Sequence, residues 1–198
     1  MNEQLLFRRA AAADIPRIMR IIARAQAQMR AAGSLQWQDG YPAESDIARD
    51  IGRGDGYVLS LPAADPAAGS AGSALPDRDS LPDMLPGGSA AGEAVAYGSA
   101  VFDGEPAYDA IDGQWLTDEP YVLVHRIAVA DGERGRGVAA EFLHRVETLA
   151  QERGVKAFRI DTNFDNQTML RLLERTGFTY CGKVVYRSGE RLAYEKRL

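Results

Sequence analysis

A glycine-rich turn is the stretch of this sequence whose residue types and spacing point most directly to chemistry. Residues 134–139 follow an apolar, β-branched run and lead into apolar residues at helical spacing. The first backbone N–H groups of a helix have no partner within it, and the helix dipole favours negative charge there. Glycines also let a ligand approach the main chain closely. The turn therefore predicts a binding site for a molecule that carries phosphates.

His125 lies in the apolar run before this turn and is the best candidate for a general base. Imidazole titrates close to neutral pH, so it can accept a proton under ordinary conditions. By the period of two along a strand, we expect His125 to point to the same side as Ile127 and Val129. The alternative is a histidine that belongs to the pocket wall and is satisfied by hydrogen bonds. The other histidine, His144, falls in the middle of a helix and is predicted to be a surface or packing residue.

Length, charge and cysteine content limit the classes of function. The 198 residues suit one domain, which we take as 1–198, and the net charge of −5 speaks against general attraction to nucleic acid. The single cysteine, Cys181, excludes an internal disulfide and a cysteine-rich zinc site, and we expect no metal. No signal-peptide pattern and no apolar run long enough to span a membrane is present, so we expect a cytoplasmic protein. Arginine over lysine, with abundant alanine and glycine, favours a GC-rich bacterial genome.

The hydrophobic patterns predict the elements that must position these groups. Helices are expected from Asp14, as a capping residue, to Gly33, and over 43–51, 138–149 and 166–175. Strands are expected at 5–8, 57–61, 93–103, 121–129, 157–162, 180–186 and 191–196. Strands and helices in this order predict an α/β fold with a mixed central sheet and helices packed on it.

Three connecting segments differ from these elements. Residues 62–92 consist mainly of Ala, Gly, Ser, Pro and Asp, so we interpret them as a disordered, low-complexity insertion. Residues 104–120 form a long loop whose large side chains, among them Tyr108 and Trp115, can fold it down. A shorter loop carries Trp37 and Tyr41, which either form a pocket wall or pack locally beneath the loop.

The glycine-rich turn also fits a dinucleotide-binding fingerprint. Gly135-x-Gly137-x-x-Ala140 has the right spacing, and Asp161 lies near the offset expected for a ribose contact. Residues 130–134 intervene between the strand and the first glycine, however, and too few βα units follow for a doubly wound sheet. A nicotinamide-dependent oxidoreductase therefore remains the weaker of two interpretations.

The second interpretation is a family resemblance. Arg134-x-x-Gly137-x-Ala139, preceded by Ile127-Ala128-Val129, resembles the Q/R-x-x-G-x-G/A motif of the GNAT superfamily of N-acetyltransferases. The later stretch NQTMLRLLERTGF, residues 166–178, resembles a second block of that family. The two blocks come in the order and spacing of the family. The resemblance as a whole covers the chain apart from residues 62–92. The resemblance implies a GNAT-type sheet whose strands at 121–129 and 157–162 splay apart to admit acetyl-CoA.

Cofactor contacts follow from the resemblance, residue by residue. Main-chain amides of the turn would hold the pyrophosphate of acetyl-CoA, and main-chain groups of the strand would pair with the pantetheine arm. Arg136 could reach a phosphate or stay solvated. The cofactor-binding set implied in this way is Ile127, Ala128, Val129, Arg134, Gly135, Arg136, Gly137, Val138, Ala139 and Asn166.

The resemblance also implies direct attack of an amine on the thioester. A histidine occupies the position of His125 in arylalkylamine N-acetyltransferases, which supports His125 as the base. A frequent general-acid tyrosine of the family falls on Leu173 here, and Met169 replaces a small residue. This departure also weakens any assignment to the ribosomal-protein acetyltransferases. The acid is then water or another tyrosine, and the candidates are Tyr97, Tyr180, Tyr186 and Tyr194. Cys181 is not expected to act as a nucleophile, because direct attack needs no covalent intermediate.

We therefore predict transfer of an acetyl group to a primary amine of a small molecule, by a monomer or homodimer. Trp37, Tyr41 and residues 104–120 are expected to line the acceptor side. A non-catalytic module that binds acyl-CoA as a sensor or partner remains open, because the acid tyrosine is missing. The acceptor itself and the acyl chain preference do not follow from the sequence.

Overall fold

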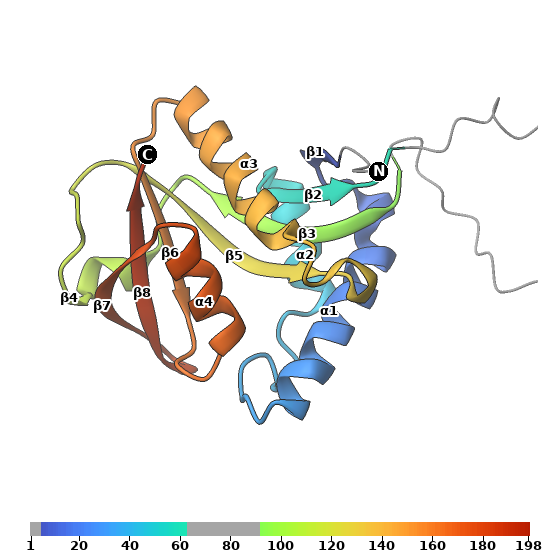
Figure 1. The fold of residues 1–198 in the computed structure, drawn as a ribbon, viewed down its shortest axis with the longest axis horizontal. Coiled ribbons are helices and arrows are strands. Elements are labelled where there is room, and N and C mark those ends of the chain that lie inside the picture. The colour runs from blue at the N-terminus through green and yellow to red at the C-terminus, as the bar shows by residue number, and fades with distance from the viewer. Residues whose placement is uncertain (1–4, 63–91) are drawn as a thin grey trace, which may run out of the picture.

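An eight-stranded sheet runs through the protein in the order β1-β2-β3-β5-β6-β8-β7-β4 (Figure 1). The structure, a computed structural model, describes residues 5–62 and 92–198. The strands are β1 (Leu6–Arg9), β2 (Gly56–Ser60), β3 (Ala94–Val101), β4 (Asp112–Gly113), β5 (Tyr121–Val129), β6 (Ala157–Thr162), β7 (Thr179–Tyr186) and β8 (Gly189–Arg197). The β5–β6 pair is parallel and the other neighbouring pairs are antiparallel. The mixed α/β sheet predicted from the sequence is confirmed.

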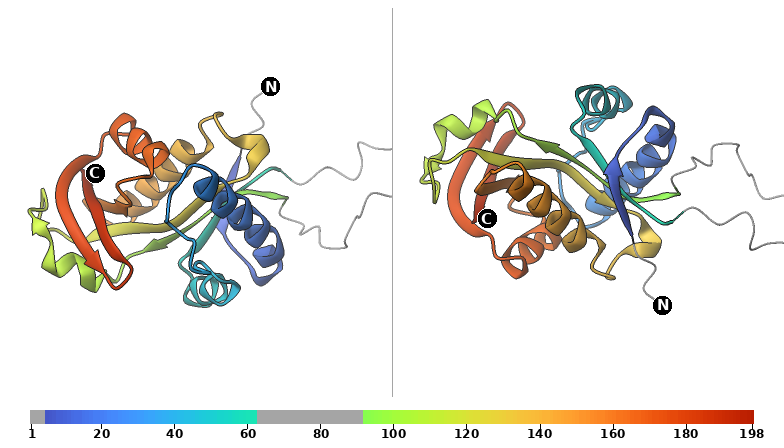
Figure 2. Two further views of the ribbon diagram at one scale, coloured as in Figure 1. Left: turned by 90° about the horizontal axis from the view of Figure 1, so that it is seen from below. Right: turned by 90° about the horizontal axis from the view of Figure 1, so that it is seen from above.

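Helices cover both faces of this sheet (Figure 2). The α-helices are α1 (Ile15–Ala31), α2 (Glu44–Arg53), α3 (Val138–Glu152) and α4 (Gln167–Arg175). Short 3-10 turns are η1 (Ala12–Asp14), η3 (Pro106–Ala110) and η4 (Asp131–Glu133). Helices α1 and α2 lie on one face, and α3 and α4 lie on the other (Figure 2). All four predicted helices form, with boundaries within two residues or so of those expected.

The apolar spacing of each helix explains which face it buries. In α3, Phe142, Leu143 and Val146 are fully buried against the sheet. The fit is tight at Gly98 of β3, where an added Cβ would lie 2.7 Å from the ring of Phe142. On the other face, Ile18 and Ile22 of α1 belong to a separate buried cluster.

Strands β5 and β6 separate after their first three residues. Their register pairs Tyr121 with Ala157, Val122 with Phe158 and Leu123 with Arg159, and no further pairing follows between the two strands. The two halves of the sheet diverge from this point, with α1 on one side of the opening and α4 on the other (Figure 1). The predicted splaying of these two strands is therefore confirmed.

Two local predictions need correction. Asp14 stands at the N-cap position of α1, but its carboxylate makes no cap hydrogen bond to that helix. It instead accepts the Ala11 amide at 2.8 Å and the Arg8 guanidinium at 2.7 Å, so it closes the preceding 3-10 turn. Residues 104–120 are not a plain loop, because they contain η3 and the edge strand β4. The predicted insertion falls largely on residues 63–91, which lie outside the described residues.

Candidate functional site

A cleft of about 760 Å³ opens where β5 and β6 separate. Its walls come from the α1–α2 loop, β5, β6, the β6–α4 connection and the β7–β8 hairpin. Five of the residues predicted from the sequence line it: Trp37, Tyr41, His125, Ile127 and Asn166. The cleft therefore brings together the predicted base, the predicted acceptor aromatics and part of the predicted cofactor strand.

A β-bulge in β5 decides which side chains face this cleft. Tyr97 of β3 pairs with Ala128 and Ser99 pairs with His125, so Arg126 and Ile127 together oppose the single residue Gly98. Arg126 adopts the left-handed conformation with φ 60°. One extra residue reverses the alternation of side chains along a strand.

The bulge makes one sequence prediction wrong. Ile127 and Val129 pack against the cluster beneath α3, whereas His125 reaches Glu105 at the start of η3. His125 thus shares its face with Leu123, which packs in the cluster beneath η3. The period of two had placed His125 on the side of Ile127 and Val129, but the bulge puts it on the opposite side.

His125 donates a hydrogen bond to Glu105. Its Nε2 lies 3.3 Å from Glu105 Oε2, and both side chains are about four-fifths buried. The second carboxylate oxygen accepts the Ala107 amide at 3.2 Å, and the Glu105 amide donates to the Tyr121 hydroxyl. The hydrogen bond from His125 lowers the pKa of the Glu105 carboxyl, with the Ala107 amide acting in the same direction against burial. With Nε2–H directed at Glu105, neutral imidazole keeps Nδ1 as its proton acceptor.

Arg126, next to this pair, is held by a buried carboxylate from α2. Its Nη1 donates to Asp50 Oδ1 at 3.0 Å and Oδ2 at 2.8 Å, and its guanidinium lies 5.4 Å from the ring centroid of Tyr41. The Tyr97 hydroxyl donates to the same carboxylate at 2.7 Å. Burial and the charge of Asp50 raise the pKa of Tyr97 far above its usual range, so this hydroxyl stays protonated.

Backbone strain is concentrated at the cleft. Among residues 5–62 and 92–198, Trp37 (φ 62°) and Arg126 (φ 60°) are the non-glycine residues with positive φ. Both line the cleft. Such conformations cost about 1–3 kcal/mol each and persist where the surroundings hold them. Their position therefore supports a functional role for this part of the molecule.

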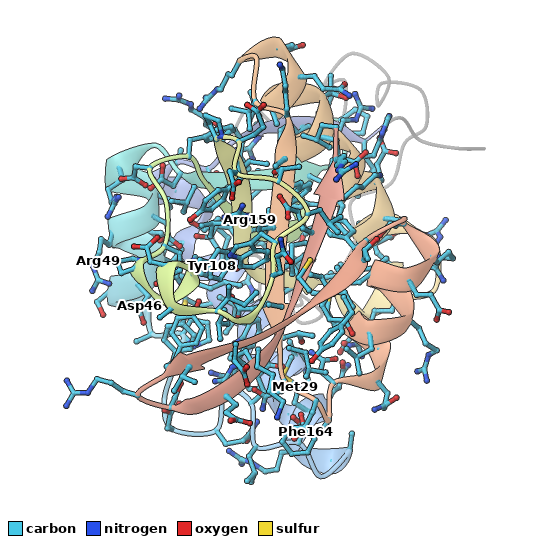
Figure 3. The ribbon with its side chains drawn as sticks, turned by 90° about the vertical axis from the view of Figure 1, so that its left-hand side faces the viewer. Met29, Asp46, Arg49, Tyr108, Arg159 and Phe164 are labelled. Carbon is cyan, nitrogen blue, oxygen red and sulfur yellow. The ribbon has the colours of Figure 1, made fainter. Side chains whose placement is uncertain are left out.

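Asp161 of β6 stands on the same face of the sheet as His125. Its Oδ1 accepts the Tyr108 hydroxyl at 2.8 Å and the Tyr186 hydroxyl at 3.0 Å. Tyr108 and Arg159, both labelled in Figure 3, each pack against the rings of Trp115 and Tyr121. Burial and the charge of Asp161 raise the pKa of both tyrosines well above the usual value, so both hydroxyls donate.

The four tyrosines proposed as general acids can now be separated. Tyr186 lines the cleft, although its hydroxyl donates to Asp161. The Tyr97 hydroxyl is buried against Asp50, and Tyr180 and Tyr194 form an edge-to-face pair away from the cleft lining. Leu173, in place of the usual tyrosine, is fully buried in the core. Because its bond to Asp161 and its raised pKa also disfavour Tyr186 as an acid, water is left as the candidate.

The glycine-rich turn follows the C-terminal end of β5, outside the lining of the cleft. Gly135 and Gly137 adopt φ angles of 76° and 83°, and an added Cβ at either position would meet nothing within 4 Å. Gly137 is the N-cap of α3, and its carbonyl accepts the Glu141 amide. Arg134 is exposed, and Arg136 donates to Glu133 at 3.0 Å. The turn thus presents an open helix N-terminus, as an anion site requires.

The remaining cofactor positions differ in how available they are. Ala128 packs in the cluster beneath α1 and α2, while Val138 is buried at the start of α3 and Ala139 is half-buried. Asn166 caps α4 by accepting the Met169 amide at 3.1 Å, and its Nδ2 donates to Gln36 Oε1 at 2.9 Å. Both ends of the Asn166 side chain are therefore engaged within the chain.

Only some of the residues predicted to line the acceptor side lie at the cleft. Trp37 and Tyr41 line the cleft, and Trp37 also packs against the cluster beneath α1 and α2. From the segment 104–120, Glu105 alone lines it among the described residues. Tyr108 and Trp115 instead pack into the cluster with Leu123, so the segment folds down onto the sheet.

Residues predicted to be inert are placed accordingly. His144 is exposed on α3, with Nδ1 3.9 Å from Glu147. Cys181 is buried, and burial raises the pKa of its thiol, which disfavours the nucleophilic thiolate. Met169 lines the cleft and packs against the core cluster. In the described part of the chain, no group of three or more His, Cys, Asp or Glu side chains could hold a metal ion, and no helix is long and apolar enough to cross a membrane.

Sequence reasoning missed Glu105, the Asp50–Arg126 pair and the acceptor-side position of Asp161. Asp50 could have been noticed, because it lies three residues after the buried Ile47 on the apolar face of α2. Arg126 is likewise a charged residue within an apolar strand. Nothing local marked Glu105, which a long connection brings to His125.

Comparison with known proteins gives a consistent result. A model of the acetyltransferase (GNAT) family matches residues 70–178. A solved acetyltransferase of the GNAT family from Streptococcus agalactiae is 34% identical, and the match covers 98% of this chain and 95% of that chain with a TM-score of 0.75. Curated proteins give no match.

More distant structures share the fold. A GNAT-family acetyltransferase from Listeria monocytogenes is 20% identical over 98% of this chain and 95% of that chain, with a TM-score of 0.66. A ribosomal-protein-alanine N-acetyltransferase from Brucella melitensis is 19% identical over 98% of this chain and 100% of that chain, with a TM-score of 0.58.

Proposed function

The chain belongs to the acetyltransferase (GNAT) family, and from that premise we propose that it transfers an acetyl group from acetyl-CoA to a primary amine of a small molecule. The observation that carries this proposal is the cleft at the splayed end of β5 and β6, with the His125–Glu105 pair on one face. The open N-terminus of α3 follows the same splayed, C-terminal end of β5. A cofactor can run between these two places along β5.

In this proposal, the two faces of the splayed strands bind different substrates. The face beneath α3 and α4 receives the cofactor, because the glycine-rich turn opens there and Ile127 and Val129 lie on that side. The face beneath η3 receives the amine, because His125 and Glu105 are there. The thioester sits between them, in the gap that the missing β5–β6 pairing leaves.

The chemistry is direct attack in a ternary complex. The amine nitrogen bonds to the thioester carbon, its proton passes to Nδ1 of His125, and the C–S bond breaks as the CoA thiolate leaves. Glu105 holds the imidazole and offsets the positive charge that it gains. The thiolate takes a proton from water. Most of the rate enhancement then comes from positioning and from the base.

Ligand-dependent unfolding followed by turnover tests the proposal. Acetyl-CoA at about 100 times its Kd should add about 2.7 kcal/mol of stability. At about 2–4 °C per kcal/mol, the midpoint should rise by roughly 5–10 °C. NAD and NADPH run in parallel should give no rise. Release of free CoA thiol with a panel of primary amines completes the test, and acetyl-CoA binding without turnover on any amine would instead favour the non-catalytic sensor.

The observed sheet does not fit a nicotinamide-dependent oxidoreductase. Its doubly wound sheet needs a series of parallel strands, whereas β5–β6 is the parallel pair in the described sheet. We retain a reducing, cytoplasmic location and a monomer or homodimer as parts of the proposal.

A further inference from the structure

Asp161 is a partly buried carboxylate of the cleft that forms no ion pair with any described residue. Three carboxylates line the cleft: Asp39, Glu105 and Asp161. Glu105 is paired with His125, and Asp39 is exposed to solvent. Asp161 is half-buried, and none of the ion pairs among the described residues includes it. A carboxylate withdrawn from water is stabilised by a cation, and a ligand can supply it.

The hydrogen bonds that Asp161 does receive fix it without neutralising it. Tyr108 and Tyr186 both donate to Oδ1, at 2.8 Å and 3.0 Å. Burial and the neighbouring charge raise the pKa of both hydroxyls, so neither gives up its proton to the carboxylate. No described residue donates to Oδ2 of Asp161. The carboxylate is thus held rigidly by one oxygen and keeps the other for a further donor.

Asn163, two residues after Asp161, carries a buried acceptor oxygen without a hydrogen-bond partner. Asn163 is 7% exposed and lines the cleft, and its Oδ1 accepts no hydrogen bond. The alternation of β6, carried one residue on, places Asn163 on the face of Asp161. The Thr162 hydroxyl is also buried without a partner, but alternation turns it to the cofactor face. Buried acceptors are normally paired, so an unpaired one in a cleft indicates a ligand donor.

Asp161 also stands across the gap from the base. Continuing the pairing of Leu123 with Arg159 by two residues sets His125 opposite Asp161, at the point where the strands have parted. The reacting amine must be neutral to attack, and His125 with Glu105 serves that nitrogen. Three arginines line the cleft, Arg126, Arg187 and Arg191, and none of them forms an ion pair with Asp161. Arg126 is bound to Asp50, and Arg191 donates to Ser188.

We propose that Asp161 and Asn163 bind a second cationic group on the acceptor, so that the preferred substrates are short aliphatic diamines or guanidino-amines. The ammonium has three N–H donors and the guanidinium five, enough for both acceptor oxygens. This proposal rests on the acetyltransferase function above and names the substrate class for its site.

The experiment compares straight-chain diamines with monoamines in which a methyl group replaces the second ammonium. Wild-type protein should favour the diamine in kcat/KM by about 10-fold or more, the weight of one charge-assisted hydrogen bond. Asp161→Asn should lower kcat/KM for the diamine to that of the monoamine, with a smaller change for the monoamine, because the amide oxygen still accepts the tyrosine hydroxyls. Asn163→Ala should reduce the preference without touching those tyrosines. The control variant Asp112→Asn removes an exposed carboxylate on β4, and it should keep the preference for the diamine.

Three results would overturn the inference. They are equal use of diamines and monoamines by the wild type, a preference that survives in Asp161→Asn, and an equal loss of both substrates in that variant. The last result would mean that Asp161 serves the reacting amine. Consumption of acetyl-CoA with monoamines keeps the proposed function standing in all three cases, whereas no turnover with any amine would reject that function first.

Discussion

The two faces of the splayed β5–β6 pair are built in different ways. The proposed cofactor face uses main-chain groups of one continuous stretch, from the end of β5 through Gly137 into α3. The proposed acceptor face uses side chains brought from distant parts of the chain, among them Tyr41, Glu105, His125 and Asp161. The first site is local in sequence, and the second exists only once the chain has folded.

Because of this difference, the proposed cofactor face is easier to predict from the sequence than the proposed acceptor face. Glycines at positive φ before a helix form an anion site wherever they occur, because the geometry belongs to the backbone. A side-chain site depends on register and on loop paths. One bulge at Arg126 turned His125 to the face opposite Ile127.

Replacing His125 should have the largest effect, because the acceptor face depends on a few side chains. His125→Gln should lower kcat by about 100-fold or more, the usual size of a lost general base. The KM for acetyl-CoA should stay unchanged, since the cofactor face is built from main chain. Steady-state kinetics from pH 6 to 9 measures both. His144→Gln is the matched control, because His144 is exposed on α3.

Two results of the His125→Gln experiment would contradict this division into two faces. A His125→Gln enzyme at the wild-type rate across that pH range would dismiss His125 as the base. A parallel rise in the acetyl-CoA KM would mean that the two faces are not separate sites.

Asp50→Asn tests the support of the bulge. Removing one partner from a buried pair leaves the other charge uncompensated, and the cost is about 3–5 kcal/mol for a full deletion. The amide keeps part of the hydrogen bonding to Arg126 and Tyr97, so we expect the free energy of unfolding to fall by about 2 kcal/mol. Urea unfolding measures it. Asp112→Asn should cost less than about 0.5 kcal/mol, and an equal loss in both variants would contradict a structural role for the pair.

Gly137→Ala probes the other face. Alanine in the left-handed conformation costs about 1–2 kcal/mol, and its Cβ stands where a phosphate would approach the turn. We expect the KM for acetyl-CoA to rise by about 10-fold while the KM for the amine stays the same. Gly132→Ala is the control, because that glycine has open space around it and no positive φ. A rise in the amine KM alone would reverse the assignment of the faces.

Most of the fold followed from periodicity and punctuation in the sequence. The stripe of Ile18 and Ile22 predicted α1, and Ser188-Gly189 predicted the β7–β8 hairpin. The predicted capping of α1 by Asp14 was wrong, because its carboxylate binds the Arg8 guanidinium instead. Strand β4 did not follow either, because two residues at a sheet edge leave no pattern.

The site was predictable only where the backbone makes it. Residues 134–139 were recognised from spacing, whereas the partner of His125 was not, because Glu105 lies 20 residues earlier in a segment without periodicity. Asp161 was assigned to a ribose contact from its offset. Its true neighbours, Tyr108 and Tyr186, come from η3 and β7 and carry no shared motif.

Glu105→Gln should have the smallest effect, and its pH dependence separates the two faces. The pKa of Glu105 is lowered in the folded state, chiefly by His125. Its contribution to stability is therefore complete above the unfolded carboxyl pKa of about 4.3 and disappears as the pH falls through the lower folded value. The side chains are partly exposed, so the contribution should stay below about 1 kcal/mol, or at most about 4 °C in the midpoint.

Thermal unfolding of wild type and Glu105→Gln between pH 7 and pH 3 measures this difference. The gap should be largest at neutral pH and close below about pH 4, because protonated Glu105 no longer differs in charge from glutamine. The Gly137→Ala gap should stay constant over the same range, since backbone strain does not titrate. A constant gap for Glu105→Gln would show that its carboxylate is not held by His125, and the acceptor face would then need another partner for its base.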